Sequence, residues 1–406
     1  MKGYKGFNPG LICKGKQYQE NTVFEEPEAK ICEKGMHFCE NPFDVLDYYD
    51  LIRSDGTPNE FAEVEALDEP KTDDREKFCS RKLKIGVKLG LSGFIKACVD
   101  FVLEKTIAEM PSENVDSGYS AKIGSSGYYA KIGSSGNSAQ IGSSGYSAQI
   151  GSSGDYAQIG SSGYSAQIGS SGYSAKIGSS GDSAKIGSSG DSAQIGSSGN
   201  SAQIGSSGDY AQIGSSGDYA QIGSSGNSAQ IGSSGYSAKI GSSGDSAQIG
   251  SSGDSAQIGS SGDSAQIGSS GDSARIGSSG DSARIGSSGY YAQIGSSGDS
   301  ARIGSSGNYA QIGSSGGSAK IGSSGYYAKI DCTGADSVIC CAGNGSVVKA
   351  PVGCWITLAE WKYDNVKQRS VPVCVKTEYV DGEKIKADTP YILKNGEFVE
   401  VQANGD

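Results

Sequence analysis

The chain has 406 residues, 64 glycines and a formal net charge of −11, and only 35% of its residues are hydrophobic. That share is too small for one conventional core of this length, and no apolar run approaches the length of a membrane span. The N-terminal residues MKGYKGFNPG contain no apolar signal segment, and the ten cysteines follow no disulfide spacing, so we expect a cytoplasmic protein with reduced thiols.

Residues 1–117 are expected to form a small α+β domain that caps the segment after it. Asn41 followed by Pro42 predicts the start of a helix that continues to about Ile52. Residues 61–67 and 82–89 have the pattern of strands. Ser92 is expected to cap a long amphipathic helix that seals the first turn of the following segment. Its apolar side would consist of Phe94, Ile95, Cys98, Val99, Val102 and Ile107.

The only histidine, His37, lies near three cysteines, so Cys13, Cys32, His37 and Cys39 could supply four zinc ligands. Their spacing matches no zinc finger or knuckle, and the alternative is a strand with buried thiols and a hydrogen-bonded imidazole. A Cys–His nucleophile would also need an orienting acid and an oxyanion site, which the sequence does not supply. We therefore predict that the protein has no metal site, no cofactor and no catalytic residue, and that it is not an enzyme.

From Gly118 the nine-residue repeat G-[Y/D/N]-[S/Y]-A-[Q/K/R]-I-G-S-S occurs 24 times without insertion, with isoleucine at every ninth position to Ile330. Alanine and isoleucine lie two residues apart with a polar residue between them, which predicts a strand with both apolar side chains inward. A nine-residue period does not fit a helix of 3.6 residues per turn. We predict that residues 118–353 form a parallel β-solenoid with two repeats per turn; three short faces per turn fit the period less well.

The outward positions of the repeat vary among Tyr, Asp, Asn, Ser, Gln, Lys and Arg. Within residues 118–330 there are 11 Asp and 10 Lys or Arg, so this segment is nearly neutral. Tyrosine occupies the second position in six even-numbered repeats but in only two odd-numbered ones, and aspartate shows the opposite bias. Exposed tyrosines with serine and asparagine are typical of adaptable binding surfaces, although the same positions could simply be solvated. The candidate binding residues are Tyr128, Tyr146, Tyr164, Tyr236, Tyr290 and Tyr326.

Residues 354–406 are expected to form a β-rich C-terminal cap. The pairs Asp381-Gly382 and Asn395-Gly396 predict hairpin turns. A small aromatic core over the last turn would consist of Trp355, Trp361, Tyr379, Tyr391 and Phe398. Both flanks would protect the open ends of the solenoid from aggregation.

Both flanks resemble proteins of phages and prophages of gut bacteria. Residues 3–7 (GYKGF) and 34–42 (KGMHFCENP) resemble a domain of unknown function found in those proteins. Residues 355–361 (WITLAEW) and 395–400 (NGEFVE) resemble the segment that closes them after a tandem-repeat array. The resemblance implies a phage or prophage origin and no established activity. The run Ser-Ala-Gln-Ile-Gly-Ser-Ser is similar to the head repeats of trimeric autotransporter adhesins, whose coils have a different period, and implies a β-roll.

Together these patterns predict a mainly β, non-enzymatic protein that binds a protein of the bacterial host, such as a defence or regulatory factor. It would act in the cytoplasm of the bacterial host cell, with the virion as the alternative location. We expect no contact with a membrane, and a homo-oligomer is compatible with the sequence. A structural fibre or adhesin shaft is the alternative function. Mimicry of DNA is a further alternative, but duplex DNA carries one charge per ~1.7 Å and the repeats are nearly neutral. Direct nucleic-acid binding is disfavoured because the charge of the flanks is acidic.

Overall fold

A computed structural model gives the structure of the chain. It describes residues 1–31, 33–53, 57–73, 76–106, 113–116 and 118–401. The chain divides into two compact parts, a first unit of Met1–Ser234 and a second unit of Gly235–Asp406. In both units short strands recur every nine residues and pair in parallel with strands 18 residues away. The predicted mainly β fold, with a parallel solenoid of two repeats per turn, is confirmed.

The first unit begins with a six-stranded antiparallel sheet, followed by one long helix. The elements before the repeats are β1 (Lys2–Phe7), β2 (Ile12–Cys13), β3 (Lys16–Gln17), β4 (Thr22–Glu25), β5 (Met36–Cys39), the 3₁₀ helix η1 (Pro42–Asp47), β6 (Glu60–Ala66), β7 (Lys77–Ser80), β8 (Lys82–Leu89), α1 (Leu91–Thr106) and β9 (Glu113–Asp116). The order of strands in the sheet is β4-β8-β6-β1-β5-β7. A core that includes Phe43, Phe61 and Phe94 joins η1, the sheet and α1.

The predicted elements of this region are found with two differences in their bounds. Strands β6 and β8 match the predicted strands at 61–67 and 82–89. Asn41 caps the predicted helix, since its Oδ1 accepts a hydrogen bond from the Phe43 amide at 3.1 Å. That helix ends at Asp47 and not near Ile52, because Ile52 turns into the core and forms a bridge with Pro58. Helix α1 already begins at Leu91, so Ser92 is not its cap, and Ile107 lies outside the described residues.

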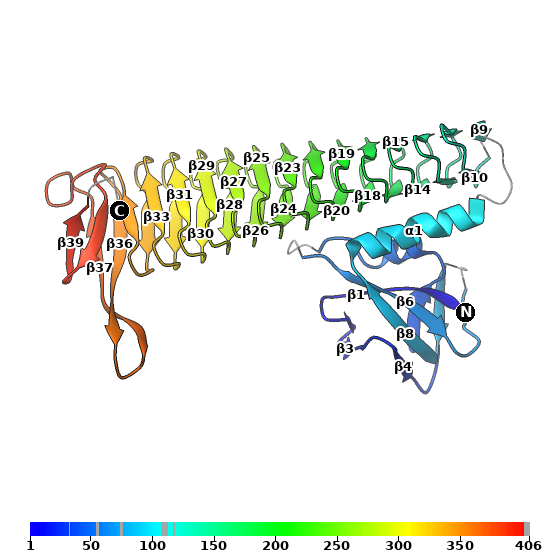
Figure 1. The fold of residues 1–406 in the computed structure, drawn as a ribbon, viewed down its shortest axis with the longest axis horizontal. Helices are drawn as coiled ribbons and strands as arrows, with labels where there is room; N and C mark the ends of the chain where they lie inside the picture. Colours follow the sequence, from blue (N-terminus) through cyan, green and yellow to red (C-terminus); the bar gives the residue numbers. More distant parts are fainter. Residues whose placement is uncertain (32, 54–56, 74–75, 107–112, 117, 402–406) are drawn as a thin grey trace. The chain divides into compact units, whose positions relative to one another are not determined.

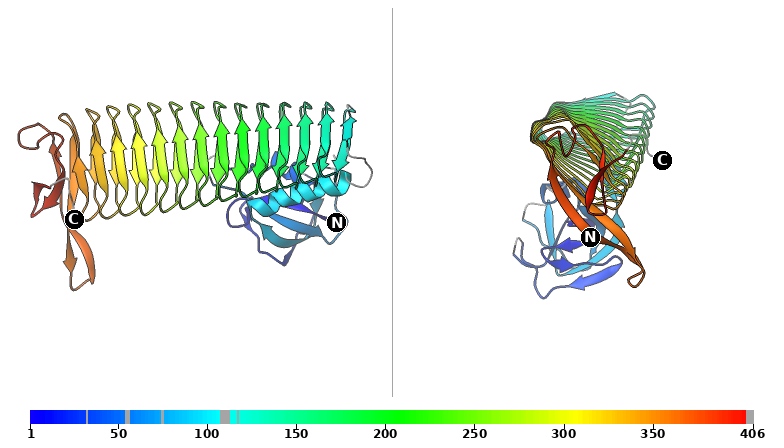
Figure 2. Two further views of the ribbon diagram at one scale, coloured as in Figure 1. Left: turned by 45° about the horizontal axis from the view of Figure 1, so that its top comes forward. Right: turned by 90° about the vertical axis from the view of Figure 1, so that its left-hand side faces the viewer.

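The repeats of the first unit form two facing parallel sheets (Figure 2). The alanine, the isoleucine and the first of the two serines of each repeat are buried between them. Their strands are β10 (Lys122–Ser125), β11 (Lys131–Ser134), β12 (Gln140–Ser143), β13 (Gln149–Ser152), β14 (Gln158–Ser161), β15 (Gln167–Ser170), β16 (Lys176–Ser179), β17 (Lys185–Ser188), β18 (Gln194–Ser197), β19 (Gln203–Ser206), β20 (Gln212–Ser215), β21 (Gln221–Ser224) and β22 (Gln230–Ser233). Even-numbered strands form one sheet, and odd-numbered strands, starting with β9, form the other. The described inward isoleucines are at most 4% exposed, so each turn buries its apolar side chains against its neighbours.

Helix α1 lies lengthwise along the even-numbered sheet of the first unit (Figure 1). It covers a glycine furrow, which is the column of outward glycines Gly160, Gly178, Gly196 and Gly214. A Cβ atom on Gly160 would lie 3.1 Å from the Val99 Cα, and one on Gly196 would lie 2.8 Å from the Ile95 Cδ1. The absence of side chains in this column therefore allows the helix to approach the sheet closely.

The prediction that this helix seals the first turn of the solenoid is wrong. Strand β9 pairs with β11 and extends the odd-numbered sheet, while α1 contacts the even-numbered strands from β10 to β20 from the side. The apolar stripe of α1 spans several turns, and a lateral furrow buries it along its length, which a single terminal turn could not do. Polar contacts flank the packed helix: Asn41 Nδ2 donates to Gln158 Oε1 at 3.1 Å, and Lys176 Nζ lies 2.7 Å from an Asp47 oxygen.

The second unit has the same two-sheet arrangement and ends in antiparallel hairpins. Its strands are β23 (Lys239–Ser242), β24 (Gln248–Ser251), β25 (Gln257–Ser260), β26 (Gln266–Ser269), β27 (Arg275–Ser278), β28 (Arg284–Ser287), β29 (Gln293–Ser296), β30 (Arg302–Ser305), β31 (Gln311–Ser314), β32 (Lys320–Ser323), β33 (Lys329–Cys332), β34 (Val338–Cys341), β35 (Val347–Lys349), β36 (Trp355–Asp364), β37 (Arg369–Tyr379), β38 (Tyr391–Lys394) and β39 (Glu397–Glu400). Strand β36 pairs with β34, and β38 pairs with β35, so the C-terminal segment adds strands to both sheets. This pairing covers the edges that the last repeats would otherwise expose.

One of the two predicted hairpin turns is found. Asn395 and Gly396 join β38 to β39 with φ angles of 54° and 74°, as a type I′ turn requires. Asp381-Gly382 forms a turn after β37 but no hairpin among the described strands, since β37 pairs with β36. The Asp381 carboxylate instead accepts hydrogen bonds from three amides, at residues 383–385, and closes a local loop.

The predicted single aromatic core of the C-terminal segment is wrong. Tyr391 is buried and contacts the Phe398 ring edge-on at 6.1 Å. Trp355 and Tyr379, which lie opposite each other on β36 and β37, are 49% and 42% exposed. Trp361 is separate from both pairs, and its Nε1 donates to the Ala342 carbonyl oxygen. The strand register decides this outcome, because it places the Trp355–Tyr379 pair on an outward face.

Candidate functional site

Three of the six predicted tyrosines form a stack on the corners of successive turns in the first unit. The ring centroids of Tyr128 and Tyr146 are 4.9 Å apart, and those of Tyr146 and Tyr164 are 5.2 Å apart. The ring planes differ by only 7° and 10°. These spacings are close to the ~4.8 Å between paired strands, so the backbone of the turns sets the stack. The three rings are 45–56% exposed, and we call them the first tyrosine ladder.

The other three predicted tyrosines do not form one ladder. Tyr236 has Asp254 at the same position of the next turn, and Tyr326 contacts the Trp361 ring edge-on at 6.2 Å. Tyr290 belongs to a different cluster, the second tyrosine ladder, in which neighbouring ring centroids are 4.7–5.5 Å apart. That ladder consists of Tyr290, Tyr291, Tyr309 and Tyr327.

The second ladder was missed in the sequence because three of its members occupy the third position of the repeat. Tyr291, Tyr309 and Tyr327 recur at intervals of 18 residues, which is one full turn. Recurrence at the turn length, and not at the repeat length, is the signal that could have identified them. Position within a turn therefore matters more than position within a repeat for deciding which side chains become neighbours.

The corners of the turns change their backbone conformation near residue 300, in odd-numbered and even-numbered repeats alike. The third-position residues Ser300, Tyr309, Ser318, Tyr327 and Asp336 have φ angles of 54–58°. The Tyr291 amide donates to the preceding turn, at the Asp272 carbonyl, whereas the Tyr309 amide donates to the following turn, at the Tyr326 carbonyl. The buried hydroxyls of Ser296, Ser305, Ser314 and Ser323 have no hydrogen-bond partner among the described residues. Left-handed φ angles cost roughly 1–2 kcal/mol per non-glycine residue, so two members of the second ladder, Tyr309 and Tyr327, stand on strained corners.

The second position of the odd-numbered repeats carries the predicted acidic bias. In the second unit this column contains Asp245, Asp263, Asp281 and Asp299 on successive turns. Asp299 Oδ1 accepts a hydrogen bond from the Gly317 amide one turn later, at 2.6 Å. In the first unit Asn137 Oδ1 accepts from the Asp155 amide in the same way, at 3.2 Å. Side chains in this column therefore brace the corner of the next turn as well as facing solvent.

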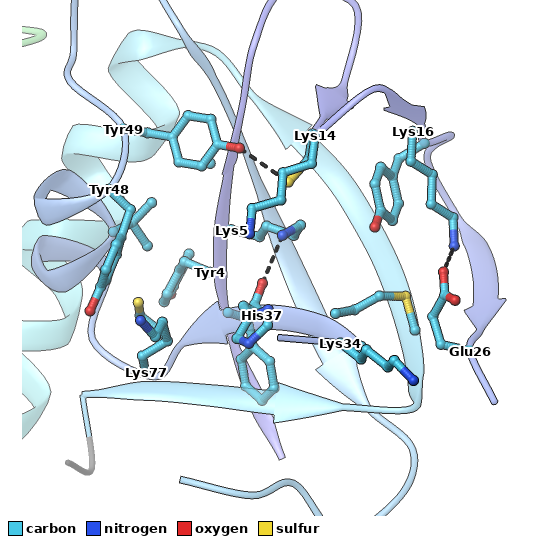
Figure 3. Close-up of a pocket in the computed structure, with 18 of the residues that line it drawn as sticks. Tyr4, Lys5, Lys14, Lys16, Glu26, Lys34, His37, Tyr48, Tyr49 and Lys77 are labelled. Carbon is cyan, nitrogen blue, oxygen red and sulfur yellow. Dashed lines mark hydrogen bonds and ion pairs between the residues drawn. The ribbon is translucent and has the colours of Figure 1, made fainter. Parts of the chain in front are cut away.

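A second candidate site is a pocket of about 890 Å³ in the N-terminal region of the first unit. Strands β1 and β5, the turn between β2 and β3, the residues after η1 and the start of β7 line it (Figure 3). Lys5 lies in its middle, 5% exposed, and its Nζ donates to the His37 carbonyl oxygen at 2.8 Å. The same ammonium lies 5.5 Å and 5.8 Å from the ring centroids of Phe7 and Tyr18. Burial lowers the pKa of Lys5.

The pocket brings together Cys13, His37 and Cys39, three of the four candidate metal ligands; Cys32 lies outside the described residues. Burial raises the pKa of Cys39 to about 12. Burial and the nearby lysine charges lower the pKa of His37 to about 4. The Tyr49 hydroxyl donates to Cys13 Sγ at 3.1 Å. Among the described residues no group of three or more His, Cys, Asp or Glu side chains is placed to hold a metal ion. The Lys5 ammonium interacts electrostatically with Cys13, His37 and Cys39, so its charge would repel a metal ion at these side chains.

The charges of the pocket divide into two sides. On one side Lys16 pairs with Glu26, and Lys34 pairs with Glu28 at 3.0 Å. On the other side Lys5, Lys14 and Lys77 all act on the His37 imidazole (Figure 3). Lys77 also lies 4.5 Å from the centre of the Tyr48 ring. Lys14 forms no ion pair within the described residues. The side around His37 is therefore positive.

The fold and these two sites define a β-solenoid protein with a pocket-bearing N-terminal domain. Residues 1–97 match the model of a family described as a domain of unknown function (DUF7666), and this stretch contains every residue that lines the pocket. Neither the curated proteins nor the solved structures gave a match to the chain. Across the described ranges, no helix has the length and apolar character needed to cross a membrane. The phage origin and the likeness to autotransporter repeats remain predictions.

Proposed function

We propose that the chain is a non-enzymatic binding protein of phage or prophage origin that recognises a protein of the bacterial host through its tyrosine ladders. The observation that carries this proposal is the first ladder, with Tyr128, Tyr146 and Tyr164 in register and about half exposed. The host protein would be a defence or regulatory factor, met in the cytoplasm of the bacterial host cell.

The physical argument rests on preorganisation. A partner that binds flexible side chains must order them, at a cost of about 0.5–1.5 kcal/mol for each side chain rich in rotamers. The ladder rings are already held parallel by their neighbours one turn away, so binding a partner requires little further ordering of these side chains. Tyrosine is also among the residues enriched at the energetic centres of protein interfaces.

The chemistry of the N-terminal pocket supports a role without catalysis. Burial raises the pKa of Cys39 to about 12 and lowers that of His37 to about 4. At neutral pH such a pair consists of a thiol and a neutral imidazole, and not of the thiolate that a cysteine nucleophile needs. The near neutrality of the repeats argues further for a protein partner over nucleic acid.

The proposal is tested by replacing Tyr128, Tyr146 and Tyr164 with serine and capturing partners from a bacterial lysate with the full chain. The control replaces Tyr156, Tyr173 and Tyr210 with serine, since these are 52–63% exposed in the same unit and form no ring contact with one another among the described residues. We expect one stoichiometric host protein with the wild type and the control, and its loss with the ladder variant. Equal capture by all three chains would refute the ladder as the binding surface. Copurification with phage particles, with a response to deletion of turns and not to loss of tyrosines, would instead support a structural fibre or adhesin shaft.

A further inference from the structure

The pocket of the first unit lies apart from the tyrosine ladders and has the size of a small-molecule site. Its volume of about 890 Å³ falls within the range of roughly 300–1,000 Å³ that is usual for ligand pockets. Its lining combines lysines with aromatic rings, and Lys5 and Lys14 extend into its centre (Figure 3). We propose that this pocket binds a phosphate-bearing ligand of nucleotide size, a role that goes beyond the proposed function of the solenoid.

The charge distribution identifies the ligand as an anion. Glu26 and Glu28 are each paired with a lysine at the edge of the pocket, and Glu33 lies 2.6 Å from Lys30. These pairs leave the acidic groups of the lining neutralised, while Lys5 and Lys14 extend into the centre of the pocket and form no ion pair within the described residues (Figure 3). Ammonium groups that converge on one volume, away from carboxylates, stabilise an anion there and repel a cation.

The buried position of Lys5 strengthens this argument. An ammonium that is 5% exposed has lost most of its water, and within the described residues no carboxylate pairs with it. Its hydrogen bond to the His37 carbonyl replaces only part of that hydration. A bound anion would supply the missing counter-charge and would favour the protonated form of Lys5. The lysine ammonium is a compact point charge that proteins use to bind phosphate.

The aromatic lining sets the size and shape of the rest of the ligand. Tyr48 and Tyr49 line the side of the pocket next to Lys5 and Lys14 (Figure 3). A phosphate alone would leave most of the volume empty, whereas a flat ring attached to it could contact these side chains. Aromatic side chains provide such stacking surfaces for nucleic-acid bases.

The test is titration calorimetry of the full chain with four probes, the 5′-monophosphates of adenosine, guanosine, cytidine and uridine. The parent nucleosides, inorganic phosphate and succinate serve as comparison probes. We expect at least one monophosphate to bind once per chain, and its nucleoside to bind at least tenfold more weakly. Lys14→Gln should weaken binding by about ten- to a hundredfold, as loss of one charge-assisted contact predicts.

The matched control is Lys84→Gln, which removes the same charge from an exposed position of β8 that does not line the pocket. Its affinity should stay within about twofold of the wild type, because exposed charges interact weakly. The proposal is wrong if no monophosphate binds at millimolar concentration, if succinate binds and the phosphates do not, or if Lys84→Gln weakens binding as much as Lys14→Gln.

Discussion

The close packing of α1 on the glycine furrow can be tested by adding one side chain to either sheet. In Gly160→Val the new Cβ would lie 3.1 Å from the Val99 Cα and 3.5 Å from the Val102 Cβ. Neither backbone nor Cβ atoms can rotate away, so α1 must shift outward. The matched variant is Gly169→Val, in the next repeat, where a Cβ would meet no atom within 4 Å. Both glycines occur in the same local sequence, Gln-Ile-Gly-Ser.

The two substitutions should have opposite effects. Overpacking of a close interface costs typically about 1–3 kcal/mol, which Gly160→Val should subtract from the stability of helix docking. Gly169→Val places a β-branched residue on an open strand face and reduces the freedom of the unfolded chain, a gain of about 0.4–1 kcal/mol.

Amide hydrogen exchange of residues 94–102 measures the stability of α1 docking directly, because a solenoid need not unfold in one step. We expect exchange of these amides to become roughly five- to 150-fold faster in Gly160→Val, the factor that 1–3 kcal/mol of local opening produces. Gly169→Val should leave their exchange unchanged. Equal acceleration in both variants, or none in either, would refute the conclusion that the missing side chains of the furrow permit docking.

Three further outcomes are expected. Ile222→Asp places a charge in the inward isoleucine column, where Ile222 is 4% exposed and pairs with Ile204. In a denaturant titration it should lower the free energy of unfolding by about 3–5 kcal/mol. Gln221→Asp, on the outward side, should stay within about 0.5 kcal/mol of wild type. Ser318→Gly should stabilise the second unit by up to about 1 kcal/mol, because glycine relieves the φ angle of 56°. Ser273→Gly, at the same position of a repeat without a strained corner, should destabilise the second unit by about 0.5–1 kcal/mol. An equal change in stability at both sites would refute the conclusion that the corner at Ser318 is strained. Burial raises the pKa of Asp44 to about 7, so between about pH 4 and 7 the unfolded chain releases a proton that the folded chain retains, and stability falls as the pH rises. Asp44→Asn should therefore match wild type near pH 4 and exceed it in denaturant midpoint at pH 8, and a constant offset across this range would exclude titration of Asp44 as the cause.

The composition of the repeat was sufficient to determine the solenoid. Ala and Ile two residues apart, with glycine and serine after them, can bury their apolar side chains only by stacking on identical repeats. The inward columns, the two strands per turn and the stacking of Tyr128, Tyr146 and Tyr164 all follow from this local rule. Local rules also predicted the cap at Asn41 and the turn at Asn395-Gly396, because those signals depend on the residues themselves and their nearest neighbours.

Tertiary structure alone decided which sheet is covered, where the corner changes and how the pocket is formed. Gly160 and Gly169 have the same sequence neighbours, so only the contact with Val99, about 60 residues away, distinguishes them. The pocket likewise joins Lys5, Lys14, His37 and Lys77 from separate strands and turns, and the register of the antiparallel sheet sets their convergence. Because Ala, Ile and Gly recur at the same positions, the frame of every turn is alike in the sequence, and contacts with residues that are distant along the chain decide which turns are covered and where the pocket lies.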